Sequence, residues 1–134
     1  MIIKIRIMPK IVLFTDSLGA GGAQRQLCGL AVFLKQAGYD VLVSTYFNID
    51  FYKKMLDESG VSNELIPGAE RAGTRLIAVR KYFRHLKPDW VIAYQETPFS
   101  IASLIKVSGI KYKLIVRERN TNQYAGFKEN LRYI

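Results

Sequence analysis

Three glycines within four positions are the part of this sequence best suited to hold a ligand. Gly19, Gly21 and Gly22 lie between an apolar run, Ile11–Phe14, and a segment with apolar residues at helical spacing. Because glycine has no Cβ, such a turn can adopt positive φ, and a ligand can approach its amides closely. The first N–H groups of a helix have no partner within it, and the helix dipole is positive there. The turn is therefore a candidate anion site, with phosphate as the expected ligand.

Two common phosphate-binding patterns do not fit this turn. The dinucleotide fingerprint requires a glycine at Gln24, and the next predicted strand ends in Val43-Ser44-Thr45, without an acid for a ribose hydroxyl. A Walker A loop is excluded because no Gly-Lys-Ser/Thr follows. A purely structural role for the glycines is the alternative, since tight strand-to-helix connections favour glycine. The candidate residues for binding the phosphate and its substrate are Gly19, Gly21, Gly22, Gln24 and Arg25.

Several other chemistries lack the residues they need. The sequence has one histidine, His85, and one cysteine, Cys28, so a zinc set, a Ser/His/Asp triad and a Cys/His pair are excluded. Asp-x-Asp does not occur, which argues against a metal-dependent sugar transferase. We expect no metal site and no bound cofactor. Glu96 and Glu118 could act as acid or base, but the expected role of each is a strand-end carboxylate paired with a cation.

Alternating strand and helix patterns predict the elements that position these residues. Strands are expected at residues 11–14, 39–46, 61–66, 90–94 and 112–116, and helices after the glycine turn and at 50–58, 74–86 and 97–107. This order predicts one α/β domain over residues 1–134, with a Rossmann-like, doubly wound, mostly parallel sheet and helices on both faces. If the first and fourth strands are neighbours, their carboxyl ends bring residues 17–25, 95–97 and 118–122 into one crevice.

Helical spacing also predicts which faces of two helices are buried. The inner face of the first helix is expected to comprise Ala23, Leu27, Leu30, Ala31, Leu34 and Ala37. In the helix at 74–86 the inner residues are expected to be Leu76, Val79, Phe83 and Leu86, with Arg75, Arg80, Lys81, Arg84 and Lys87 largely off that face. This helix is amphipathic and strongly basic. We expect His85 to face solvent.

Charge and composition limit the partners and the compartment. The sequence has 20 Lys+Arg against 11 Asp+Glu, a net charge of +9, which favours an anionic partner such as a phosphate ligand, an acidic membrane surface or nucleic acid. The lone Cys28 suggests a buried thiol in a reducing compartment. Lys4 and Arg6 interrupt the apolar N-terminus, so a signal peptide is not expected. We expect a cytoplasmic protein, with peripheral attachment at the inner face of the membrane as a further hypothesis.

Several segments resemble those of one enzyme family. Residues 10–25, 37–41, 87–93 and 117–120 are similar, in this order, to segments of the family 4 glycosyltransferases, which are retaining enzymes of the GT-B fold. The resemblance covers most of the chain. It departs from the family at Gln24, where glutamate is frequent. It also departs at the end of the fourth strand, where many members carry histidine and this chain has Tyr94-Gln95-Glu96.

The resemblance implies a division of labour between two domains. This chain would be the acceptor-side domain of a hexosyltransferase of cell-envelope polysaccharide biosynthesis, and the C-terminal donor-binding domain would be missing. The glycine loop would lie near the diphosphate of a nucleotide-sugar co-substrate, without a metal, and the acceptor would be a glycan, a polysaccharide or a lipid-linked sugar. No catalytic residue can be carried over. The acceptor-side candidates are Ser17, Gln95, Glu96, Glu118, Arg119 and Asn120.

Three further expectations follow. The chain alone should be inactive, and its exposed interdomain face should allow self-association. The basic helix could face an anionic membrane, although a solvated outer face explains it equally well.

The rival function is a non-enzymatic basic module that binds nucleic acid or a small anion. Its support is the net charge and the position of Tyr82 and Phe83 among cations. No known nucleic-acid motif occurs, so we expect no specific nucleic-acid partner.

Overall fold

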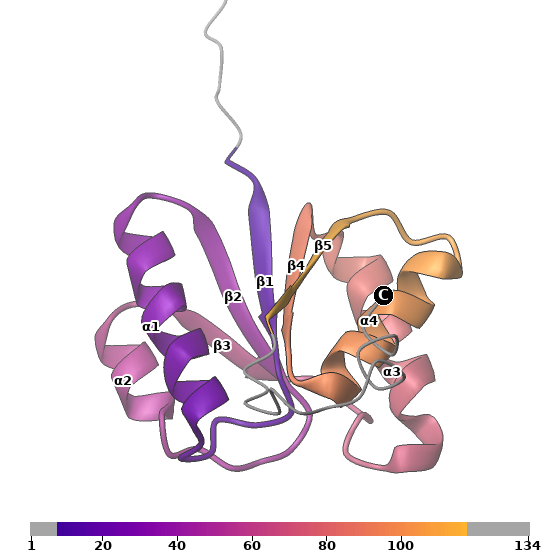
Figure 1. Ribbon diagram of the computed structural model, residues 1–134, viewed down its shortest axis with the longest axis horizontal. Coiled ribbons are helices and arrows are strands. Elements are labelled where there is room, and N and C mark those ends of the chain that lie inside the picture. Colours follow the sequence, from indigo (N-terminus) through magenta and orange to yellow (C-terminus); the bar gives the residue numbers. More distant parts are fainter. Residues whose placement is uncertain (1–7, 118–134) are drawn as a thin grey trace, which may run out of the picture.

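Five parallel strands form one sheet in the computed structural model, which describes residues 8–117 (Figure 1). The strand order is β3-β2-β1-β4-β5. The strands are β1 (Lys10–Phe14), β2 (Asp40–Thr45), β3 (Ser62–Leu65), β4 (Trp90–Tyr94) and β5 (Lys113–Arg117). At its carboxyl end β1 places Phe14 opposite Ser44 of β2 on one side and Ala93 of β4 on the other. The predicted doubly wound fold, with the first and fourth strands as neighbours, is confirmed.

Helices cover both faces of this sheet. One face carries α1 (Gly22–Gln36) and α2 (Lys53–Glu58), and the other carries α3 (Ala72–Leu86) and α4 (Glu96–Val107) (Figure 1). Successive side chains of a strand point to opposite faces. Val12 and Phe14 therefore join the core beneath α3 and α4, whereas Ile11 and Leu13 join the core beneath α1 and α2. All four side chains are buried, so β1 is apolar on both faces.

Aromatic rings fill the core beneath α3. The ring of Phe83, which is fully buried, meets Phe14 edge-on at 5.4 Å between centroids and Tyr112 at 5.6 Å. The Tyr112 hydroxyl donates to the carbonyl of Ala102 on α4. Burial raises the pKa of Tyr112, so this phenol stays protonated and can donate. Phe83 thereby joins the sheet, α3 and the segment before β5.

The inner face of α3 differs from the predicted one in its first turn. Leu76 is 42% exposed, and Arg75 lies toward the sheet instead. The Arg75 guanidinium lies 4.4 Å from the ring centroid of Tyr46, and its Nε donates to the Ala69 carbonyl at 2.8 Å. An arginine can cover aromatic rings with its stem and guanidinium while it donates to nearby carbonyls. The predicted inner position of Leu76 and outer position of Arg75 are therefore wrong.

The other predicted positions on the helix faces mostly agree with the structure. Val79 and Phe83 are buried, Leu86 packs against the same core, and His85 is exposed as predicted. On α1, Ala37 is exposed because the helix ends at Gln36 and Ala37 is its C-cap, so its predicted inner position is wrong. The buried residues of α1 are Gln24, Leu27, Cys28 and Ala31. Burial raises the pKa of the Cys28 thiol to about 11.

Replacing Lys87 by glycine is expected to stabilise the protein. Lys87 ends α3 at φ 53°, in the left-handed region where glycine is the usual residue, and its N–H donates to the Phe83 carbonyl at 2.9 Å. Relief of this strain should raise the free energy of unfolding by about 0.5–1 kcal/mol, measured by urea denaturation. Lys81→Gly, within α3, is the matched control and should lower that free energy by about 1 kcal/mol. Equal losses in both variants would contradict the argument.

Candidate functional site

Buried polar residues gather at the carboxyl ends of the central strands. The buried polar residues within positions 8–117 are Thr15, Ser17, Gln24, Ser44 and Thr45. They belong to the segment after β1, to the end of β2 and to the first turn of α1. Burial of a polar group is costly unless it is hydrogen-bonded, and every buried side-chain nitrogen and oxygen in this part of the chain has a partner. The buried polar groups at this edge are therefore hydrogen-bonded within the chain.

Asp16, Gln24 and Gln95 form a hydrogen-bonded cluster at this edge. Gln24 Nε2 donates to Asp16 Oδ1 at 3.0 Å. We assign the Gln95 amide with its nitrogen toward Asp16, because it then donates to Oδ1 at 3.1 Å and to Oδ2 at 3.2 Å. Its oxygen then accepts from Gln24 Nε2 at 3.3 Å. The cluster joins the loop after β1, the first turn of α1 and the junction of β4 with α4, so the predicted meeting of residues 17–25 with 95–97 is confirmed for Gln24 and Gln95.

The N-terminus of α1 lies beside this cluster without a side-chain cap. Its N-cap is Gly21, no side chain hydrogen-bonds there, and the first turn has no acidic residue. Gln24 is the third residue of the helix, a position from which a glutamine often reaches back to the cap. Here its side chain reaches Asp16 instead. The first amides of α1 and the helix dipole are therefore directed toward this edge, as an anion site requires.

The loop glycines provide space rather than unusual backbone angles. Gly21 has φ −85° and ψ 163°, and the glycines at positive φ among residues 8–117 are Gly38, Gly60, Gly68 and Gly109. The turn therefore does not use the positive φ that its glycines permit. A Cβ on Gly21 would lie 2.2 Å from Gln24 Oε1, which is closer than real atoms approach. Glycine at position 21 thus lets the Gln24 side chain lie against the backbone.

The backbone of Gln95 is strained, and hydrogen bonds hold it in this conformation. It is the N-cap of α4, with φ 75° and ψ 163°, a region that residues other than glycine rarely occupy. Such a conformation costs about 1–3 kcal/mol and persists where surrounding contacts enforce it, often at ligand sites. Contacts that enforce it here are the hydrogen bonds from the Gln95 side-chain amide to Asp16 and the hydrogen bond from the Gln95 N–H to the Arg117 carbonyl at 3.4 Å.

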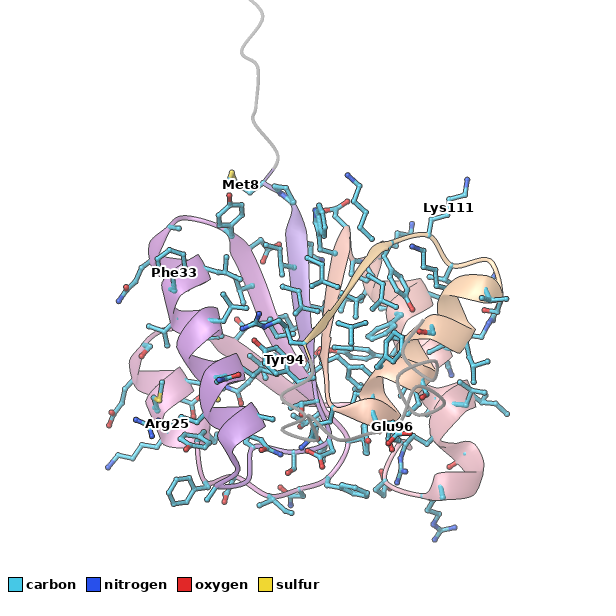
Figure 2. All side chains as sticks on the ribbon, viewed as in Figure 1. Met8, Arg25, Phe33, Tyr94, Glu96 and Lys111 are labelled. Atoms are coloured by element: carbon cyan, nitrogen blue, oxygen red, sulfur yellow. The ribbon has the colours of Figure 1, made fainter. Side chains whose placement is uncertain are left out.

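The remaining predicted site residues occupy different places. Ser17 is buried and its Oγ accepts from the Gly19 N–H at 3.2 Å, so it shapes the turn. Gly22 is the first residue of α1. Arg25 and Glu96 are exposed, and Figure 2 shows Arg25 on the α1 side of the sheet and Glu96 on the α4 side. Glu118, Arg119 and Asn120 lie outside the described residues.

Asp16 is the site residue that the sequence analysis missed. Its signal in the sequence is a carboxylate two residues after a buried strand, and the topology places that strand at the switch point of the sheet. Burial is the main reason that the pKa of Tyr46 is raised to about 12. The nearby Asp16 carboxylate adds to this shift, and the Arg75 guanidinium opposes it. The phenol below this edge is therefore neutral at physiological pH.

Residues 8–117 lack two further kinds of functional feature. This part of the chain contains no group of three or more His, Cys, Asp or Glu side chains placed to hold a metal ion. None of its helices has the length and apolar character needed to cross a bilayer.

Comparison with known proteins identifies the fold. No protein-family model and no curated protein matches the sequence. The fold is similar to that of a glycosyltransferase from Rickettsia africae (TM-score 0.61, 12% identity, 81% of this chain covered). It is similar to that of MurG from Acinetobacter baumannii (TM-score 0.62, 20% identity, 93% of this chain covered). It is also similar to that of HepE from Anabaena, determined in complex with UDP and glucose (TM-score 0.60, 19% identity, 81% of this chain covered). The chain covers 29%, 39% and 29% of these proteins, respectively. Its Rossmann-like fold is thus shared with part of GT-B glycosyltransferases, as the sequence predicted.

Proposed function

We propose that this chain is the acceptor-side half of a glycosyltransferase that moves a sugar from a nucleotide-sugar to a glycan, polysaccharide or lipid-linked acceptor. The observation that carries the proposal is the Asp16–Gln24–Gln95 cluster beside the uncapped N-terminus of α1, at the edge where β1 and β4 are neighbours. In doubly wound sheets ligands bind at this point. The shared fold with glycosyltransferases supports the same class.

The start of α1 suits the diphosphate of the donor, and the Asp16–Gln24–Gln95 cluster suits sugar hydroxyls. The amides at the start of α1 offer donors and a positive dipole end to the diphosphate, whose negative charge grows as the sugar leaves. The Asp16 carboxylate and the amides of Gln24 and Gln95 suit sugar hydroxyls, which both donate and accept hydrogen bonds. We propose that the reaction proceeds with retention and without a metal, as the family resemblance implies.

An open apolar groove supports the proposal that further protein packs on this domain. A hollow of about 400 Å³ lies between α1 and the β4–β5 half of the sheet. Its apolar lining includes Leu30, Leu34, Trp90, Ile92 and Ile115, of which Ile115 is 39% exposed. Apolar surface of this kind is stabilised when other protein covers it.

The variant Gly21→Val is expected to weaken UDP binding at least tenfold while the fold survives. A side chain at position 21 must displace Gln24 from Asp16 and crowd the first amides of α1. Amide shift changes at residues 19–22 during a UDP titration measure the binding, and circular dichroism checks the fold. The matched control is Gly29→Val, because a Cβ on Gly29 meets nothing within 4 Å. If UDP shifts these amides equally in the two variants, or in neither the variants nor the wild type, the proposed site is wrong.

A further inference from the structure

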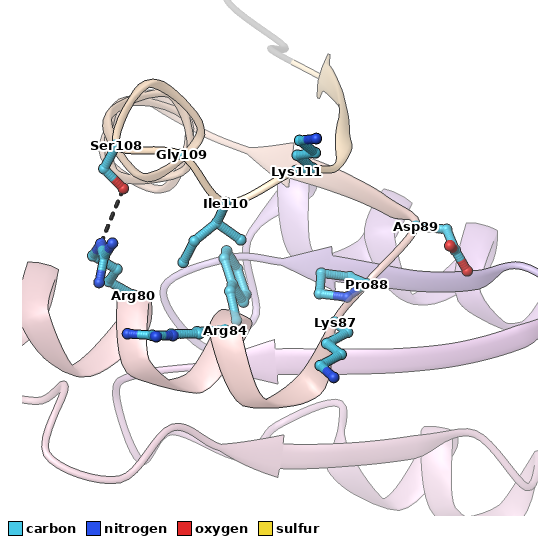
Figure 3. Close-up of a pocket in the computed structure, with 10 residues that line it drawn as sticks. Arg80, Arg84, Lys87, Pro88, Asp89, Ser108, Gly109, Ile110 and Lys111 are labelled. Carbon is cyan, nitrogen blue, oxygen red and sulfur yellow. Dashed lines mark hydrogen bonds between the residues drawn. The ribbon is translucent and has the colours of Figure 1, made fainter.

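A second hollow lies at the opposite edge of the sheet from the candidate site. It occupies about 500 Å³ where α3 and α4 end and β4 and β5 begin (Figure 3). We call it the amino-edge pocket and define its basic rim as Arg80, Arg84, Lys87 and Lys111. Phe83, Pro88 and Ile110 form its apolar part. The lining therefore contains four cationic side chains and one carboxylate, that of Asp89.

That carboxylate is engaged elsewhere. Asp89 Oδ2 accepts from the Lys10 N–H at 2.7 Å, and Figure 3 shows its side chain turned away from the two arginines. The ion pairs formed within residues 8–117 are Lys53–Asp57 and Lys54–Glu58, both on α2. The four cations of the basic rim thus have no carboxylate partner in the described part of the chain.

Helix ends account for only part of this positive charge. The C-termini of α3 and α4 both lie at the pocket, and each carries the equivalent of about half a negative charge. Together they match about one of the four cations. Arg80 is hydrogen-bonded to the end of α4, since its Nε donates to Ser108 Oγ at 3.0 Å. That hydroxyl in turn donates to the Ile105 carbonyl at 2.6 Å. A surplus of positive charge therefore remains.

The rim is also partly fixed in position. The bond to Ser108 ties Arg80 to the end of α4, and the left-handed conformation of Lys87 places that residue where the chain turns into β4. Arginine presents a planar set of N–H donors that matches phosphate oxygens in pairs. Two arginines and two lysines around one hollow suit a doubly charged, multi-oxygen ligand better than a single carboxylate.

We propose that the amino-edge pocket binds a phosphate group, carried either by a soluble phosphate ester or by an anionic lipid headgroup. The pocket lies at the amino ends of the strands, so this site is separate from the proposed donor and acceptor site. It does not depend on the proposed function.

Titration of the 134-residue chain with inorganic pyrophosphate, followed by amide chemical shifts, tests the site. We expect saturable shifts at Ser108, Gly109 and Ile110. The double variant Arg84→Gln/Lys111→Gln should bind at least about tenfold more weakly, since each lost charge-assisted bond weakens binding several-fold. The control Lys35→Gln/Lys81→Gln removes the same charge outside the pocket and should change the affinity less than twofold. Absence of saturable shifts, or equal weakening in both variants, would overturn the proposal.

Vesicle sedimentation separates the two sources of phosphate. Pelleting with phosphatidylglycerol but not phosphatidylcholine vesicles, lost in the pocket variant and kept in the control, would identify a lipid headgroup. Pyrophosphate binding without pelleting would identify a soluble phosphate ester. Equal pelleting of the pocket and control variants, without saturable pyrophosphate shifts, would contradict the proposal. Shifts at residues 19–22 report on the other site, so the failure of one proposal is distinguishable from the failure of the other.

Discussion

Incubated with nucleotide-sugars and candidate acceptors, the 134-residue chain alone is expected to form no product above the no-protein control. Catalysis requires interactions that are stronger in the transition state than in the ground state, and here the developing charge lies on the leaving diphosphate. The start of α1 offers only a few N–H donors toward that charge, and the family resemblance implies that a second domain supplies the remaining contacts. Mass spectrometry of the acceptors measures the outcome.

The control for this experiment is a longer protein in which the same chain is joined to a donor-binding domain. If the proposed function is right, the longer protein transfers sugar and the 134-residue chain does not. Turnover by the short chain would show that the proposed division of labour between two domains is wrong.

Substituting Phe83 with alanine is expected to lower the free energy of unfolding by about 3–5 kcal/mol. Phe83 is fully buried and its ring packs edge-on against Phe14 and Tyr112, so truncation leaves a cavity between α3 and the sheet. A loss of this size is a large fraction of the stability of a typical domain. Urea denaturation, followed by circular dichroism, measures it.

The matched control is Phe33→Ala on α1. Phe33 is 65% exposed and projects from the outer side of its helix (Figure 2), so its loss should change the free energy of unfolding by about 0.5 kcal/mol or less. Similar losses in the two variants would mean that the aromatic core beneath α3 does not stabilise the protein as argued.

The sequence was sufficient to predict the order and type of the elements. β4 was predicted without error because Lys87-Pro88-Asp89 ends one pattern and a short apolar run follows. The inner face of α3 was less predictable. Leu76 and Arg75 are adjacent in the sequence, and helical spacing alone favours the apolar one. The rings of Tyr46 and Phe47, which lie far from α3 in the sequence, make the arginine the better inner residue.

The candidate site was predictable in position but not in detail. The parallel topology placed Gln24 and Gln95 at one edge, because carboxyl ends of parallel strands meet there. It could not show that Gln24 is buried and bonded to Asp16, since that bond depends on side-chain packing between β1 and α1. The role of Gly21 was missed for the same reason. Its lack of a side chain matters because of Gln24, which shares its turn, and not because of its own backbone angles.

The position of β1 in the middle of the sheet has a consequence for the synthesis of this protein. β2 follows β1 closely in the chain, but β4, the partner on its other side, emerges from the ribosome only after α3. Until then, β1 presents a row of unpaired N–H and C=O groups on an apolar strand, a template for pairing with another chain. Until Trp90–Tyr94 has been synthesised, pairing of β1 with another chain therefore competes with completion of the sheet.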